Sequence, residues 1–134
     1  MIKVESKIRV RYGETDKMGF VYYGNYPLYF EVGRTDLIRN LGLTYKDIEN
    51  SGVLMPVHNV SINYIKPGKY DELLTVKTYL KELPKARIKF EYEILNEQNE
   101  IITTGETTLF FLNNKTLKPM KAPDVLLSVL STYF

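Results

Sequence analysis

The chain has 134 residues, 44% of them hydrophobic and 25% charged, with a formal net charge of +2 and no cysteine. This length fits one domain over residues 1–134, and the ordinary composition excludes disordered and fibrous classes. The small net charge and the lack of a basic run with interleaved aromatics speak against nucleic-acid binding, and the lack of cysteine excludes disulfides and thiol catalysis. No segment reaches the roughly 18 apolar residues of a membrane span, so we expect a cytoplasmic protein.

A strand is expected at the N-terminus. Apolar and charged residues alternate there, as a strand with one buried face requires. The expected buried face consists of Ile2, Val4, Ile8, Val10 and Tyr12.

A long helix is expected after a turn-rich segment. Asn25 can cap it, Pro27 is tolerated in a first turn that needs no intrahelical N–H, and Gly42 suits the position after the last turn. Spacings of three and four produce an apolar stripe of Tyr26, Phe30, Gly33, Leu37 and Leu41. Mostly off this stripe lie Glu31, Arg34, Thr35, Arg39 and Asn40.

Four further strands are expected at residues 57–65, 73–83, 86–94 and 101–112, with turns between them. Residues 44–52 have a helical character that the pattern does not decide, and residues 125–130 suit a short helix on the sheet edge. One strand, a long helix and four more strands can bury their apolar faces if an antiparallel sheet wraps around the helix. The sequence therefore predicts an α+β fold.

The segment between the first strand and the helix carries the candidate chemistry. Asp16 lies in a loop with Gly13, Gly19 and Gly24, a few residues before the helix. Open N–H groups at a helix start can stabilise an oxyanion. A nearby carboxylate can attack a carbonyl carbon or take a proton from water. The segment therefore suits chemistry on a carbonyl.

A family resemblance rests on this run of residue types at fixed offsets: Tyr12-x-x-Thr15-Asp16-x-x-Gly19-x-Val21-Tyr22-x-x-Asn25-Tyr26, followed by Phe30-Glu31 and Arg34. The run resembles the signature of the YbgC-like group, in the 4-hydroxybenzoyl-CoA thioesterase branch of the hotdog-fold acyl-CoA thioesterases. The resemblance implies a hotdog fold and hydrolysis of acyl-CoA to free acid and CoA. Two departures, Tyr23 where relatives often have histidine and Glu14 where they often have aspartate, leave the acyl preference open.

The resemblance also implies site residues. Asp16 would be the catalytic carboxylate, as nucleophile or general base, and the backbone from Tyr23 to Asn25 would polarise the thioester carbonyl. The expected oxyanion and substrate-binding residues are Gly19, Tyr23, Gly24, Asn25 and Tyr26, with Tyr22, Glu31 and His58 as possible supporting residues. Candidates for the CoA phosphates are Lys66, Lys69, Arg87 and Lys89, although ordinary solvated side chains are an equal alternative for each.

Several features narrow the chemistry. A helix glutamate such as Glu31 more often pairs with an arginine such as Arg34 than acts as an acid. His58 is the only histidine, and we expect it to be a hydrogen-bonded strand residue near a dimer seam. No cluster of metal ligands appears, so a metal or redox cofactor is not expected, and the CoA thioester is the substrate.

Three alternatives stay open from the sequence: a thioesterase for acyl-carrier-protein substrates, a hotdog dehydratase or hydratase, and a non-catalytic acyl-thioester-binding protein. A dehydratase would need a histidine paired with an acid. The long strands leave a sheet edge or face for a second chain, so we expect a homo-oligomer, either a dimer or a dimer of dimers such as a homotetramer.

Overall fold

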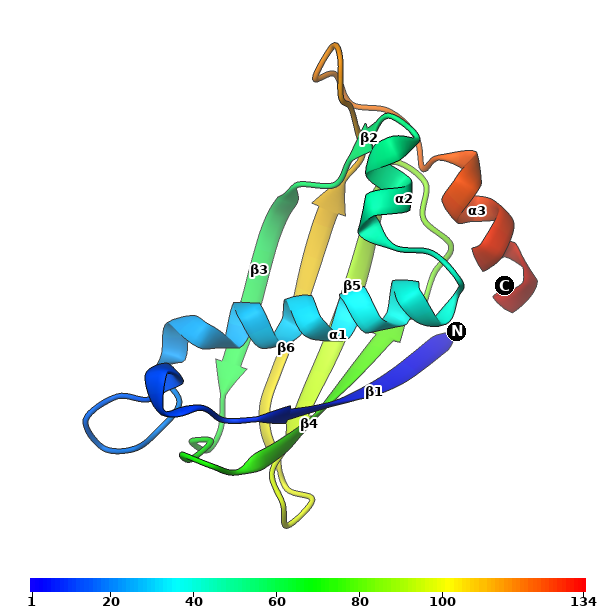
Figure 1. The fold of residues 1–134 in the computed structure, drawn as a ribbon. Coiled ribbons are helices and arrows are strands. Elements are labelled where there is room, and N and C mark those ends of the chain that lie inside the picture. Colours follow the sequence, from blue (N-terminus) through cyan, green and yellow to red (C-terminus); the bar gives the residue numbers. More distant parts are fainter.

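The alternating N-terminal segment forms β1 (Ile2–Arg9), the outermost strand at one edge of an antiparallel five-stranded sheet. A computed structural model describes residues 1–134. The other strands are β3 (Val57–Tyr64), β4 (Leu73–Leu80), β5 (Arg87–Leu95) and β6 (Ile101–Phe110). Their order is β1-β4-β5-β6-β3. Figure 1 shows this sheet curving around the long helix α1 (Tyr26–Asn40), which confirms the predicted hotdog fold.

The core lies between α1 and the concave face of the sheet. The alternation of β5 places Ile88, Phe90, Tyr92 and Ile94 on this face, all fully buried or nearly so. Phe30 of α1 stacks on Tyr92, with ring centroids 4.2 Å apart and planes 7° apart. Burial of these large side chains is the main stabilising contribution and fixes the height of the helix above the sheet.

The helix ends as expected. Gly42 has φ +85°, and its N–H donates to the carbonyl of Arg39 while the N–H of Leu43 donates to that of Ile38. This pair of hydrogen bonds is a Schellman motif, which favours glycine because its left-handed backbone lacks a Cβ clash.

The buried face of α1 is wider than the predicted stripe. It also contains Tyr29, Arg34 and Ile38. Arg34 was expected off the stripe and is only 7% exposed, because α2 (Tyr45–Asn50) covers the side of α1 that the arginine faces. A single-helix pattern cannot anticipate such a second cover.

Strand β3 differs most from the expected burial. The alternation of Val60, Ile62 and Tyr64 is present, but the strand is exposed along its length except for a half-buried Ile62. The reason is its place at the sheet edge, where only β6 pairs with it. Tyr12 was also wrongly placed on a buried face. It begins a short 3₁₀ turn after β1 and is 79% exposed.

Smaller elements complete the chain. The undecided segment forms α2, capped by Thr44, whose hydroxyl accepts from the N–H of Asp47. Strands β2 (Val53–Leu54) and β7 (Leu112–Asn113) pair with each other, and the expected C-terminal helix is α3 (Asp124–Leu130). None of the helices has the length and apolar character that crossing a membrane would need.

Candidate active site

Asp16 sits in a loop that is closed by its own backbone. Its N–H donates to the carbonyl of Phe20 at 2.8 Å, and its carbonyl accepts from the N–H of Gly19 at 3.0 Å. Gly19 has φ +75°, a conformation that disfavours a Cβ. Asp16 Oδ1 accepts from the N–H groups of Met18 and Phe20 at 2.9 and 3.2 Å. The carboxylate is exposed, and one of its oxygens is held in place while Oδ2 has no hydrogen-bond partner.

The Asp16 loop rests on the turn between β3 and β4. The N–H of Val21 donates to the carbonyl of Gly68, and the N–H of Tyr70 donates to that of Gly19, both at 2.8 Å. Gly68 is buried, and its N–H donates to the hydroxyl of Tyr26 at 3.2 Å. These contacts bring Gly19 and Tyr26, two of the expected site residues, into one structural unit.

The helix start differs from the expectation. Asn25 does not cap α1: it has helical dihedrals, because a 3₁₀ turn (Tyr23–Asn25) leads directly into the helix. A capping residue needs an extended backbone. Instead, Asn25 Nδ2 donates to the carbonyl of Glu14 at 2.8 Å. The first N–H groups of the turn, those of Tyr23 and Gly24, have no carbonyl one turn earlier within it.

Glu14 takes part in the site through side-chain hydrogen bonds that the sequence motif did not predict. Its carboxylate accepts from the backbone N–H and guanidinium of Arg11 and from the hydroxyl of Tyr29. Burial raises the pKa of Glu14, but these hydrogen bonds outweigh it, and the net pKa lies below the ordinary value. Burial of Tyr29 and its hydrogen bond to the Glu14 carboxylate raise the pKa of the Tyr29 hydroxyl, so this phenol stays protonated and donates. No local sequence pattern could predict the hydrogen bond between Glu14 and Tyr29, because the two residues are 15 positions apart.

Three tyrosines form a groove beside the 3₁₀ turn. The ring of Tyr64 lies 5.5 Å from that of Tyr26 and 6.3 Å from that of Tyr23, both edge to face. The hydroxyl of Tyr64 donates to the carbonyl of Tyr23 at 3.2 Å. The hollow has a volume of about 240 Å³, and Ile65, Lys66 and Pro67 complete its lining. Tyr64 was not expected in the site, because only the sheet register brings the end of β3 there.

The supporting residues are placed differently from one another. Tyr22 packs on Tyr23, with ring centroids 4.7 Å apart. Glu31 is exposed on α1 and does not pair with Arg34, which takes part in no ion pair of the chain. The expected helix pair is therefore wrong. The buried Arg34 faces Tyr45 and Tyr92 rather than solvent, beyond the reach of Glu31.

The side chain of His58, in β3, makes no hydrogen bond to another residue. Its ring lies 4.2 Å from that of Phe110, near the opposite end of β3 from Tyr64. Six residues of strand separate the two, or about 20 Å. The expected hydrogen bond is absent because both faces of β3 are open here, and within one protomer His58 is remote from the Asp16 loop.

The four candidate phosphate contacts divide into two groups. Lys66 and Lys69 belong to the turn on which the Asp16 loop rests, and Lys66 pairs with Glu100. Arg87 and Lys89 lie at the start of β5. Arg87 is 5.1 Å from the Phe110 ring, and Lys89 pairs with Glu106. Only the first group is near Asp16 in one protomer.

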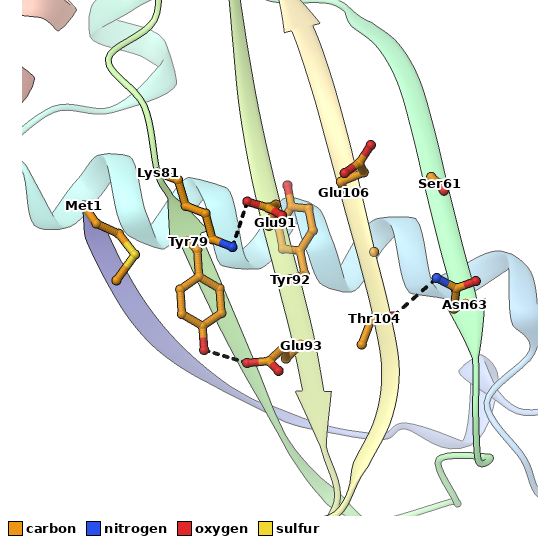
Figure 2. A pocket seen from close by; sticks show the side chains of 11 residues that line it. Met1, Ser61, Asn63, Tyr79, Lys81, Glu91, Tyr92, Glu93, Thr104 and Glu106 are labelled. Carbon is orange, nitrogen blue, oxygen red and sulfur yellow. Dashed lines mark hydrogen bonds and ion pairs between the residues drawn. The ribbon is translucent and has the colours of Figure 1, made fainter.

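A second hollow, of about 680 Å³, lies on the outer face of the sheet. Figure 2 shows that its side chains are mainly polar and are joined across the strands, with Tyr79 bonded to Glu93 and Lys81 to Glu91. Asp16 does not line it. Asp16 does not line the tyrosine groove either, but Tyr23, whose N–H is open, does. We therefore place the candidate site at this smaller groove together with the Asp16 loop that precedes Tyr23. No group of three acidic or histidine side chains in the chain is arranged to hold a metal ion.

The sequence model of the thioesterase-like superfamily matches residues 10–130. The chain belongs to this superfamily. A putative acyl-CoA thioesterase from Bacillus subtilis, YneP, is 38% identical over 87% of this chain and 85% of its own. The Escherichia coli acyl-CoA thioester hydrolase YbgC is 24% identical over 87% of each chain.

Solved structures agree with this assignment. The DHNA-CoA thioesterase of Staphylococcus aureus is 41% identical, with a TM-score of 0.86 over 100% of this chain and 85% of its own. This superfamily member is thus a hotdog thioesterase of the YbgC-like group, as its motif indicated. The thioesterase superfamily match includes the Asp16 loop, α1 and every strand of the sheet except β1.

Proposed function

We propose that the protein hydrolyses acyl-CoA thioesters to a free acid and CoA. The observation that carries this proposal is the ordered, exposed carboxylate of Asp16 on the loop that leads into the open N–H groups before α1. A carboxylate and preorganised backbone donors are the two groups that cleavage of a thioester needs. The names of YneP and YbgC support the same substrate class.

Asp16 is the proposed catalytic residue, and Oδ2 is the atom that reacts. In the general-base route, Oδ2 takes a proton from water as the water oxygen attacks the thioester carbon, and the thiolate of CoA then leaves and is protonated. In the nucleophilic route, Oδ2 bonds to the carbonyl carbon, CoA leaves, and water cleaves the resulting anhydride. Both routes use an oxygen that the loop leaves free while the other oxygen is held.

The N–H groups of Tyr23 and Gly24 are the proposed oxyanion donors. They stand at the start of a 3₁₀ turn, without an acceptor inside it, and both residues are exposed. Backbone donors that are fixed before the reaction lower the barrier because they need no reorganisation as charge develops on the carbonyl oxygen.

We further propose an aromatic acyl group as the preferred substrate. The groove presents the exposed rings of Tyr23 and Tyr64, backed by the buried ring of Tyr26, and these aromatic surfaces suit a flat ring better than a flexible chain. The 41% identity to a DHNA-CoA thioesterase favours the same class. Lys66 and Lys69, on the turn beside the loop, are the proposed contacts for the CoA phosphates.

A homo-oligomer belongs to the proposal. The free edge of β3 is eight residues long and exposes Val57, Val60 and Tyr64 next to unpaired backbone groups. Such an edge is a template for pairing with another strand. We expect sedimentation at micromolar concentration to show a dimer or a dimer of dimers, and a stable, active monomer would contradict this.

The deciding experiment is release of free thiol from a panel of aromatic and aliphatic acyl-CoAs and acyl-carrier-protein thioesters. We expect the parent protein to favour aromatic acyl-CoA. Asp16→Asn keeps the shape of the side chain but removes its basicity, so turnover should fall at least about 10²-fold. Its thermal melt should match the parent. A folded Asn variant with parental turnover would remove Asp16 from the mechanism and make Glu31 the next residue to test. A parent that binds these thioesters without hydrolysing them would instead support the non-catalytic alternative.

A further inference from the structure

The side chain of Glu14 joins two elements that are far apart in the sequence. Oε1 accepts from the N–H of Arg11, at the end of the β1 segment, at 2.9 Å and from the hydroxyl of Tyr29, in α1, at 3.0 Å. Oε2 accepts from the Arg11 guanidinium at 3.0 and 3.2 Å. Tyr29 is 2% exposed, and the Glu14 side chain is 15% exposed. The carboxylate is therefore a mostly shielded tie between the β1 end and the second turn of the helix.

The backbone carbonyl of Glu14 makes a second tie. It accepts from the N–H of Tyr22 at 2.9 Å and from Asn25 Nδ2 at 2.8 Å. Through this one oxygen, the residue before the Asp16 loop contacts the residue after it and the last residue of the 3₁₀ turn. Side chain and carbonyl together hold the base of the loop against α1.

The loop itself has no other bond to α1 than those at its base. Its internal hydrogen bonds link Asp16 with Met18, Gly19 and Phe20, and these bonds keep its shape but not its direction. Its remaining contacts go to the turn between β3 and β4. The loop is therefore fixed relative to the open N–H groups from two sides, by its base and by the β3–β4 turn, which Gly68 connects to Tyr26 of α1. Only the base ties the loop to the segment after β1 and to Tyr29.

We propose that Glu14 is a positioning residue, which fixes the Asp16 loop at the start of α1 through its bonds to Arg11 and Tyr29. This inference rests on the thioesterase function proposed above. Glu14 does not touch the groove that would hold the substrate. Its effect is on geometry: a catalytic group displaced by about 1 Å can lose 10²-fold in rate.

The length of the side chain is the property that matters. Aspartate at position 14 could still accept from the N–H of Arg11, but it is one methylene too short to reach Tyr29 as well. Glutamine keeps the reach and one acceptor oxygen. We therefore expect Glu14→Gln to retain most activity, with larger losses for Glu14→Asp and Glu14→Ala in that order.

The central test removes only the helix end of the tie. Tyr29→Phe deletes one hydroxyl, and we expect kcat with an aromatic acyl-CoA to fall about tenfold while KM stays within about threefold. Amide hydrogen exchange of residues 15–25 should become roughly three- to tenfold faster, as expected for loss of one hydrogen bond. This second readout needs no turnover.

The chain offers a matched control. Tyr79 donates to Glu93 at 2.6 Å on the outer face of the sheet (Figure 2), so Tyr79→Phe deletes the same kind of bond away from the loop. We expect kcat and exchange of residues 15–25 to stay parental in this variant.

Two results would overturn the positioning role. One is unchanged exchange of residues 15–25 in folded Tyr29→Phe, whether or not the protein proves to be a thioesterase. The other is faster exchange with parental kcat, which would make the tie structural only. Failure of the parent to hydrolyse any thioester would instead reject the proposed function, while the exchange result would still decide whether Glu14 holds the loop.

Discussion

Two charged side chains, Glu14 beside the start of α1 and Arg34 in its second half, are shielded from water in different ways. Near its start, Glu14 is held by four donor groups, from Arg11 and Tyr29. In its second half, Arg34 is 7% exposed, its Nε has no acceptor, and it pairs with no carboxylate. The carboxylate beside the helix start is held by directional hydrogen bonds, whereas the arginine in the second half is held by packing.

This difference separates function from stability along one helix. Hydrogen bonds to a shielded carboxylate specify direction but add little net free energy, because water offers similar bonds to the unfolded chain. Close packing against β4 and β5 adds most of the stability and tolerates little change of volume. Changes to the hydrogen bonds around the helix start should therefore alter turnover, and changes to the packed face of α1 should alter the free energy of unfolding.

The largest expected effect on stability is at Gly33. A Cβ there would lie 2.2 Å from Thr78 Oγ1 and 3.1 Å from Val76 Cγ1, both in β4. Gly33→Ala should lower the free energy of unfolding by about 1–3 kcal/mol through overpacking, despite the better helix propensity of alanine. Denaturant titration measures this, with Gly13→Ala as a control because a Cβ at Gly13 meets nothing within 4 Å. A Gly33→Ala protein as stable as the parent would show that close packing of α1 on β4 does not limit stability at this position.

Gly24, in the 3₁₀ turn just before α1, gives the opposite expectation. A Cβ there would meet only the ring of Tyr22, at 2.7 Å, and that ring is exposed and can move. Gly24→Val should therefore lower thioesterase turnover about tenfold, since it disturbs the proposed oxyanion donors, while the melting temperature changes little. Parental turnover in this variant would place the oxyanion donors elsewhere.

Arg34→Met should change the free energy of unfolding less than Gly33→Ala does, and in the opposite direction. Replacing a buried charge that lacks a carboxylate partner with an apolar side chain of similar length should leave the free energy of unfolding unchanged or raise it by about 1 kcal/mol. A decrease beyond about 1 kcal/mol would mean that Arg34 has a stabilising polar partner, either the Tyr45 and Tyr92 hydroxyls that it faces or an acceptor from a second copy. Denaturant titration at two protein concentrations distinguishes these outcomes.

Acid should slightly weaken the hydrogen bonds that the Glu14 carboxylate makes beside the helix start. The pKa of Glu14 in the folded protein lies below its ordinary value of 4.5, because hydrogen bonds outweigh the opposing effect of burial. The stabilisation is therefore complete above about pH 4.5 and is lost as the pH falls through the folded-state pKa. The loss should not exceed about 1 kcal/mol, since the pair with Arg11 is partly open to water. Melting curves of the parent and Glu14→Gln from pH 6 to pH 3 should converge, and parallel curves would contradict a depressed pKa.

Local pattern was enough for the long strands and the long helix of this protein, although not for α2, β2, β7 or the 3₁₀ turns. The alternation of the strands, the helix period and the punctuation by Pro27 and Gly42 depend on neighbours within a few positions, so the strands and α1 could be predicted within a few residues. The motif around Asp16 likewise identified the family, because its residue types lie at fixed offsets along one stretch of chain.

Only the tertiary structure decided which side chains meet. Glu14 bonds to Tyr29 across 15 positions, and Tyr64 reaches Tyr23 across 41, because the sheet register and the height of α1 bring them together. The same long-range packing buried Arg34 under α2, left β3 exposed at the sheet edge, and assigned Asn25 to Glu14 instead of the helix cap. Periodicity describes one element at a time, whereas burial and partners depend on the elements packed around it.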